Sequence, residues 1–285
     1  SLDDLTGAIE LYHTLIGLGR YDDALNVFDD RLRHATVYRL SISRQQLELL
    51  MALFPDGETA SPRLSDVGAQ AWTLNALALG YSASGQPGRA APLFQRNIKI
   101  REEQNKLDSI AIVSNNLAEA LLLSGGLHAS EGATRRALAI TRELHNLFEE
   151  AISLQHMGLV QAARGTDGIT ALRRPLRLWI AQSDQQGEGL VNAHLAGALL
   201  SRGEYAAARR YADRAWQLAP NLRYEADFIR AACRQGQAAL GLGDVSTADE
   251  RLHHALTRAR AINFAEEELP ALIGLAELTR RRGDS

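Results

Sequence analysis

The chain repeats itself with a period of ~40 residues, which lies within the range typical of stacked-repeat proteins. One glycine in each repeat makes the period visible, and after an early Gly19 these glycines follow one another at nearly constant spacing as Gly85, Gly125, Gly165, Gly203, Gly243 and Gly283. In a stacked-repeat protein each unit packs only against its neighbours. Because these arrays present a long concave surface, the pattern indicates a chain that binds other molecules rather than one that transforms them.

Each repeat has the pattern of two amphipathic helices joined at the glycine. In the second repeat, Leu74, Leu77 and Tyr81 recur at helical spacing and lie on one face of the first helix. Gly85 ends that helix because glycine tolerates the left-handed backbone that a helix end needs. Pro87 then suits the first turn of the second helix.

Small residues stand at fixed offsets from these glycines and predict close helix crossings. Seven residues before the glycine the chain has Ala78, Ala118, Gly158, Ala196, Gly236 and Ala276. Five residues after it the chain has Ala24, Ala90, Ala208 and Ala248. Short side chains let two helix backbones approach closely where they cross. We therefore predict an all-α protein of the α-solenoid class.

The N-terminal part departs from the period, because the interval from Gly19 to Gly85 is much longer than those that follow. The segment from Arg44 to Phe54 is apolar-periodic and predicts an inserted helix, and Pro55-Asp56-Gly57 predicts a turn into a loop over 55–64. We expect residues 1–64 to form a helical repeat with an inserted helix and loop. We expect the remaining repeats at about 65–105, 106–146, 147–185, 186–221, 222–262 and, incomplete, 263–285.

Composition argues against several functional classes. The formal net charge is −3 with both signs interspersed, which argues against a nucleic-acid binder that works by counterion release. No apolar run approaches the ~18 residues that span a bilayer and no signal peptide opens the chain, so we expect a cytoplasmic protein with no membrane partner. The sequence has no HExxH, GxSxG or metal-spaced Cys/His set, so we expect no enzyme, cofactor or metal site. The single Cys233 is expected to be an inert, half-buried thiol.

The small-residue offsets resemble those of the tetratricopeptide (TPR) repeat. In TPR order, the fifth repeat carries Leu195, Ala196, Gly203, Ala208, Ala215 and Pro220, and the second carries Leu77, Ala78, Tyr81, Gly85, Ala90 and Phe94. A TPR usually has a period of ~34 residues. The longer period here is similar to that of the long-helix TPRs of kinesin light chains and several bacterial regulators. The resemblance implies a right-handed superhelix of helical hairpins whose first helices line a concave groove.

A narrower resemblance concerns residues 53–58, LFPDGE, and the following segment 69–103. Both look like the TPR sensor segments of bacterial STAND-type NTPases, in which a nucleotide-binding switch precedes the repeat array. This chain has no GxxxxGK[ST] phosphate loop, so such an NTPase would lie outside it. Because the chain starts without methionine and stops just after Gly283, before a second helix, we expect an excised piece of a longer polypeptide.

The TPR resemblance places the groove positions thirteen, ten, nine and six residues before each glycine. The candidate ligand-binding residues at these offsets are Trp72, Asn75, Asn115, Asn116, Glu119, Gln155, His156, His194, Arg230, Arg234 and Gln237. A buried amide is costly without a partner, so the amides would offer donors and acceptors to a peptide backbone. Trp72 would supply a hydrophobic anchor. The alternative is that these side chains bond to neighbouring helices.

The leading functional hypothesis is therefore a non-catalytic sensor. A peptide, a protein or another ligand would occupy the groove, and its differential affinity for two curvatures of the array would bias an attached STAND-type switch. A stand-alone scaffold that holds proteins together is the alternative from a different class. A third hypothesis is an enzyme within the segment 1–64.

Overall fold

The computed structural model describes residues 2–33, 43–221 and 224–283. Within these ranges the regular structure is helical, and no strand occurs. The α-helices in chain order are α1 (Leu2–Gly17), α2 (Tyr21–Val27), α3 (Ser43–Met51), α4 (Val67–Ala83), α5 (Pro87–Glu103), α6 (Leu107–Leu123), α7 (Leu127–Glu143), α8 (Leu147–Ala163), α9 (Gly168–Ala181), α10 (Gln185–Leu200), α11 (Tyr205–Leu218), α12 (Glu225–Gly241), α13 (Val245–Ala261) and α14 (Ala265–Arg282). A π-helical turn η1 (Phe28–Leu32) follows α2, and a 3-10 turn η3 (Ala219–Asn221) follows α11.

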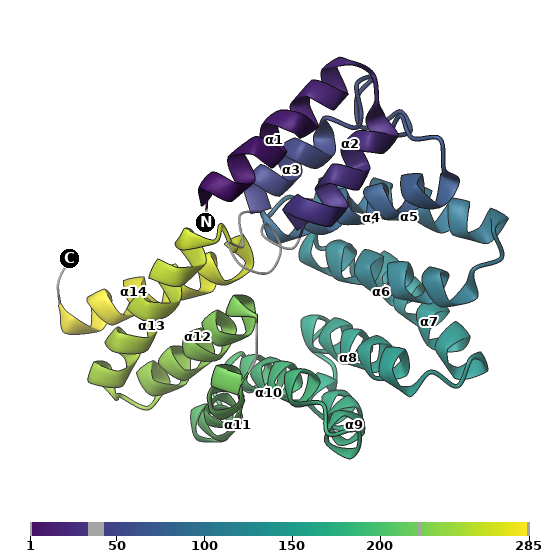
Figure 1. Cartoon of the computed structure of the whole chain (residues 1–285). Coiled ribbons are helices and arrows are strands. Elements are labelled where there is room, and N and C mark those ends of the chain that lie inside the picture. The colour runs from purple at the N-terminus through teal and green to yellow at the C-terminus, as the bar shows by residue number, and fades with distance from the viewer. Residues whose placement is uncertain (1, 34–42, 222–223, 284–285) are drawn as a thin grey trace.

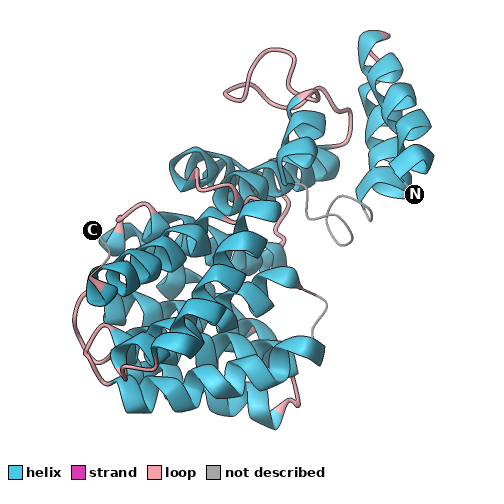
Figure 2. Cartoon of the chain, turned by 90° about the vertical axis from the view of Figure 1, so that its left-hand side faces the viewer, coloured by secondary structure: helices cyan, strands magenta, loops and turns pink. Residues whose placement is uncertain are grey.

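The helices pair into hairpins that stack in chain order around a common centre (Figure 1). The first helices α6, α8, α10 and α12 lie toward that centre, and their partners α7, α9, α11 and α13 lie outside them. Figure 2 shows the N-terminal helices standing away from the remaining array, so the hairpins climb along an axis instead of forming a flat ring. The prediction of an α-solenoid built as a right-handed superhelix is confirmed.

The glycine turns have the predicted backbone. Each of the seven glycines that define the period has a φ between 72° and 81°, in the left-handed region. At Gly125, for example, the glycine N–H donates to the carbonyl of Leu122 at 3.0 Å, and the next N–H, of Gly126, donates to the carbonyl of Leu121 at 2.8 Å. These bonds satisfy carbonyls that a helix end leaves without partners.

The return turns between hairpins use the same conformation without glycine. The residues with positive φ there are Asn105, His145, Ser183 and Asn263, with values between 53° and 56°. Asparagine adopts the left-handed region more readily than most residues, whereas histidine and serine carry no strong turn signal. The turn within each hairpin was therefore predictable from the sequence, and the turn that joins one hairpin to the next was not.

Small residues are required where the two helices of a hairpin cross. A Cβ atom added at Gly158 would lie 2.7 Å from the side chain of Leu172, and one added at Gly236 would lie 2.7 Å from that of Leu252. Both distances are far below van der Waals contact. Ala118, the equivalent residue on α6, is fully buried. The offset of seven residues thus marks the crossing itself.

The inserted helix is part of the N-terminal core. Instead of reaching Phe54 as predicted, α3 ends at Met51, because Leu53 and Phe54 turn inward and are buried. The phenolic hydroxyl of Tyr12 donates to the carbonyl of Leu49, which ties α1 to α3. The apolar core around these residues continues without interruption into α4, α5 and α6. In the described part of the chain, no helix has the length and apolarity to cross a bilayer.

Candidate ligand-binding face

The first helices present a row of polar side chains toward the centre of the superhelix. We define the inner face as the surface formed by Asn75, Asn116, Glu119, His156, His194, Arg230, Arg234, Glu266 and Glu267. These residues come from α4, α6, α8, α10, α12 and α14 in order. Helices that are far apart in the sequence thus contribute to one surface.

Trp72, at the start of this row, packs against the protein itself. Its ring lies 6.1 Å from the ring of Phe28, centroid to centroid, and the guanidinium carbon of Arg33 lies 5.4 Å from its ring centroid. Trp72 is half-buried as a result. One side of the predicted hydrophobic anchor is therefore engaged with the π-helical turn η1.

Two asparagines connect α4 to α6. The Nδ2 atom of Asn116 donates to Oδ1 of Asn75 at 3.3 Å, and both side chains are half-buried. The remaining groups, Nδ2 of Asn75 and Oδ1 of Asn116, have no hydrogen-bond partner among the described residues. This pair can therefore still offer a donor and an acceptor to a ligand.

Asn115 is placed differently. Only 1% of its surface is exposed, its Nδ2 donates to Oε2 of Glu149 at 3.2 Å, and its Oδ1 accepts from the hydroxyl of Ser153 at 3.0 Å. Both partners belong to α8. Burial raises the pKa of Glu149, and the bond from Asn115 opposes that rise. Asn115 thus connects two neighbouring helices, as the alternative interpretation expected.

The middle of the row carries uncharged side chains. Gln155 and His156 on α8 are buried, and burial lowers the pKa of His156 to about 4. Nδ1 of His156 is buried and has no partner in the described part of the chain. His194 on α10 is half-buried, and burial together with Arg230 and Arg234 lowers its pKa well below the ordinary value. Both imidazoles are therefore neutral at physiological pH.

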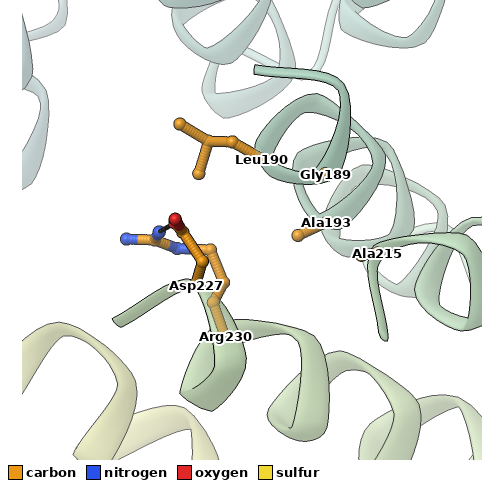
Figure 3. A pocket seen from close by; sticks show the side chains of 6 residues that line it. All are labelled: Gly189, Leu190, Ala193, Ala215, Asp227 and Arg230. Carbon is orange, nitrogen blue, oxygen red and sulfur yellow. Dashed lines mark ion pairs between the residues drawn. The ribbon is translucent and has the colours of Figure 1, made fainter. Parts of the chain in front are cut away.

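Arg230 is the centre of a buried ionic network between α12 and α14. Its side chain is 9% exposed, and its guanidinium nitrogens lie 3.1 Å from Glu266, 3.2 Å from Glu267 and 3.6 Å from Asp227. Burial by itself would lower the pKa of Arg230, but these three carboxylates and that of Glu119 on α6 raise it, so the charge is retained. Figure 3 shows Arg230 and Asp227 projecting from α12 toward Leu190 on α10.

Arg234 extends this network by one helical turn. It donates to Oε1 of Glu267 at 2.9 Å and to Oε1 of Gln237 at 3.1 Å. Gln237 in turn donates to the carbonyl of Pro270 at 3.3 Å. Glu267 is fully buried, and burial raises its pKa while the two arginines oppose the rise. These predicted site residues are thus brought together, with most of their polar groups bonded to α14.

The acidic partners of the two arginines were not among the predicted site residues. Asp227, Glu266 and Glu267 lie in the first turns of α12 and α14, upstream of the offsets that define the groove. Asp227 meets Arg230 within α12, three residues away, whereas Glu266 and Glu267 reach the arginines from the neighbouring helix α14. The signal in the sequence was the run of three consecutive glutamates at residues 266–268, which begins two residues after the buried Phe264.

Glu119 faces this network from the other wall. It is half-buried on α6, and burial and the charge of Glu266 raise its pKa to about 7, against the opposing effect of Arg230. Figure 1 shows α6 across the common centre from α12 and α14, in agreement with this influence. A second contact supports this closure, since a Cβ added at Gly85 would lie 2.7 Å from the Cβ of Ala265. The two walls of the inner face thus influence each other's protonation.

One shallow pocket opens between α10, α11 and α12. It is lined by Gly189, Leu190, Ala193, Ala215, Asp227 and Arg230 (Figure 3). Apolar residues and the Asp227–Arg230 ion pair line it together, and it is too small to enclose a ligand. Cys233 on α12 is fully buried instead of half-buried as predicted, and burial raises the pKa of its thiol. Within the described ranges, no group of three or more His, Cys, Asp or Glu side chains could hold a metal ion.

Comparison with known proteins relates the chain to others through structure. No protein-family model matches the sequence, and no curated protein matches it. The structure of NprR in complex with its cognate peptide NprX superimposes with a TM-score of 0.65 at 13% identity, over 95% of this chain and 83% of NprR. A Rap protein complexed with Competence and Sporulation Factor gives a TM-score of 0.62 at 12% identity, over 91% of this chain and 78% of Rap.

A third similar structure is a STAND protein with a tetratricopeptide repeat sensor from Pyrococcus horikoshii. It gives a TM-score of 0.55 at 17% identity, over 98% of this chain. The chain spans 43% of the length of that protein. Identities this low show the fold alone, and the fold is TPR-like, which confirms the resemblance to TPR repeats, a fold that this STAND protein shares.

Proposed function

We propose that the chain is a non-catalytic sensor module that binds a peptide or an exposed protein segment on the inner face. The observation that carries this proposal is the Asn75–Asn116 pair, which retains a free donor and a free acceptor on a concave surface. An extended peptide backbone carries both kinds of group and needs both partners once it is removed from water. The complexes of NprR with its peptide and of Rap with its factor, on a similar fold, support this choice of ligand class.

We further propose that binding regulates an attached signalling switch. A ligand that touches both α6 and the α12–α14 wall would favour one curvature of the array by its differential affinity for the two states. The similarity to the STAND protein from Pyrococcus horikoshii supports a covalently linked N-terminal NTPase as that switch. Such a module would belong to a cytoplasmic bacterial protein. A stand-alone scaffold remains the alternative, and full-length sequence without a phosphate loop upstream would favour it.

The test is a selection from a random linear peptide library on the immobilised chain, followed by affinity measurements on one selected peptide. Replacing Asn75 and Asn116 together by alanine should weaken that peptide roughly tenfold or more, because partner groups on the peptide are left unpaired. The matched control is Asn26→Ala, an exposed asparagine on the outer helix α2, which should leave affinity unchanged. If no peptide is selected, or if both variants bind equally well with intact helical content, the proposal is wrong.

A further inference from the structure

Glu119 is a half-buried carboxylate without a cation. No lysine or arginine among the described residues forms an ion pair with it, and it accepts no hydrogen bond there. The charge that it feels most strongly is another carboxylate, that of Glu266 across the inner face. Removing an ionised carboxylate from water is unfavourable unless a cation or donors replace the water. The fold therefore places on α6 a carboxyl group with a raised pKa, and no lysine or arginine of the described residues forms an ion pair with it.

The opposite wall cannot supply that partner, because its cations are already shared among more carboxylates than they can neutralise. Arg230 and Arg234 are in contact with Asp227, Glu266 and Glu267. Two guanidinium charges thus meet three carboxylates before Glu119 is counted. The wall has a deficit of positive charge in a region shielded from solvent.

The histidines do not correct this deficit. His156 and His194 are held neutral by burial, and for His194 also by the nearby arginines. His156, 6% exposed, keeps its Nδ1 atom without a hydrogen-bond partner in the described part of the chain. It lies close enough to His194 to affect the protonation of that ring. A second polar group beside the charged residues therefore also lacks a hydrogen-bond partner.

We propose that the inner face selects peptides with a basic side chain, a lysine or an arginine that is seated between Glu119 and Glu266. This inference rests on the proposed peptide-binding function and names the class of ligand within it. An acidic or phosphorylated ligand is disfavoured because both inner arginines are already paired with carboxylates. The cation supplies the charge that the two walls lack and connects α6 to α14.

This geometry also links recognition to the shape of the array. Glu119 and Glu266 lie on opposite walls and repel each other when both are ionised. A cation between them replaces this repulsion with two attractions and draws the walls together. Gly85, just after the end of α4, closely approaches Ala265, at the start of α14. The ligand therefore acts where the first repeats meet the last.

The same peptide library, panned in parallel on the wild-type chain and on the Glu119→Gln variant, tests the proposal. Glutamine keeps the size of the side chain and removes the charge. The wild type should enrich peptides with lysine or arginine at one fixed position, and the variant should lose that enrichment. The matched control is Glu143→Gln, an exposed glutamate on the outer helix α7, which should select the same peptides as the wild type.

One selected peptide and its Lys→Gln or Arg→Gln version then complete a double-mutant cycle with Glu119→Gln. We expect each single change to weaken binding about tenfold or more and the two together to be far less than additive. Wild-type affinity should rise as the pH increases through 7, where Glu119 ionises, and the Glu119→Gln variant should not show this rise.

Two outcomes have different meanings. Selected peptides without a basic position, or additive effects in the cycle, would overturn this inference and leave peptide binding in place. A library from which nothing binds would instead overturn the proposed function, and this inference with it.

Discussion

The two ends of the inner face use their polar side chains for opposite purposes. On α4 and α6, Asn75 and Asn116 form a single 3.3 Å bond and leave polar groups free. On α12 and α14, Arg230 and Glu267 belong to a network that is almost entirely shielded from solvent. The first end is therefore available to a ligand, whereas the second end is occupied by its own residues.

The difference shows that a groove offset specifies where a side chain points and not what remains for it to bind. Asn116 and Arg234 both lie nine residues before a turn glycine. In the repeat after Asn116, the first helix α8 brings it no acidic partner. In the repeat after Arg234, the first helix α14 begins with glutamates, of which Glu267 neutralises the arginine. Removing residues from the two ends should therefore have unequal effects on stability.

The largest expected effect is that of Arg230→Ala. This change leaves the buried Glu267 and the half-buried Glu266 and Asp227 without the cation that they share, and breaking a buried ionic network typically costs ~3–5 kcal/mol. The control is Arg136→Ala, which removes an exposed ion pair with Glu102 between α7 and α5 and should cost less than ~1 kcal/mol. Urea unfolding followed by circular dichroism measures both free energies. If both variants lost the same free energy of unfolding, the α12–α14 network would be no more important for stability than an exposed ion pair.

A smaller effect should appear at acidic pH through His156. Its pKa is about 4 in the folded chain and about 6.5 when unfolded, so between these values only the unfolded state binds the proton. This contribution to stability is complete above pH 6.5 and is lost as the pH falls toward 4, by up to about 3 kcal/mol. In unfolding curves over this range, His156→Gln should flatten the acid-side loss.

Glu119 makes the stability of the folded chain change with pH in the opposite direction. Its folded pKa of about 7 is above its ordinary value, so the folded chain retains a proton that the unfolded chain has released. Its contribution is therefore lost as the pH rises toward 7, and Glu119→Gln should become relatively more stable at and above neutral pH. If His156→Gln and Glu119→Gln changed the pH profile in the same direction, the assignment of both environments would be wrong.

The smallest expected effects compare two glycines. At Gly236 a new Cβ would lie 2.7 Å from the side chain of Leu252 and 3.1 Å from its backbone nitrogen, so Gly236→Ala should destabilise the array by ~1–3 kcal/mol. At Gly132 on α7 nothing lies within 4 Å of the added atom, so Gly132→Ala should stabilise it by ~0.5–1 kcal/mol. Thermal unfolding of both variants gives the signs. Stabilisation by Gly236→Ala would show that the α12–α13 crossing has room to spare.

The period, the helical hairpins, the glycine turns and the crossing positions were all predictable from the sequence. They depend on local chemistry repeated at a constant interval, such as the left-handed backbone at Gly125 and the missing side chain at Gly158. The inserted helix was also predictable, although its end at Met51 was not, because the burial of Leu53 and Phe54 decides it.

The candidate site was predictable only as a row of positions. Three features of the site depend on how far the array curves. They are the bonding of Asn115 to α8, the sharing of acidic partners by the two arginines, and the position of Glu119 opposite Glu266. Curvature accumulates from small rotations between successive hairpins, and no single repeat encodes it. The sequence thus determined the unit and the order of stacking, while the tertiary structure decided which distant units meet, because that depends on the sum of all the crossings.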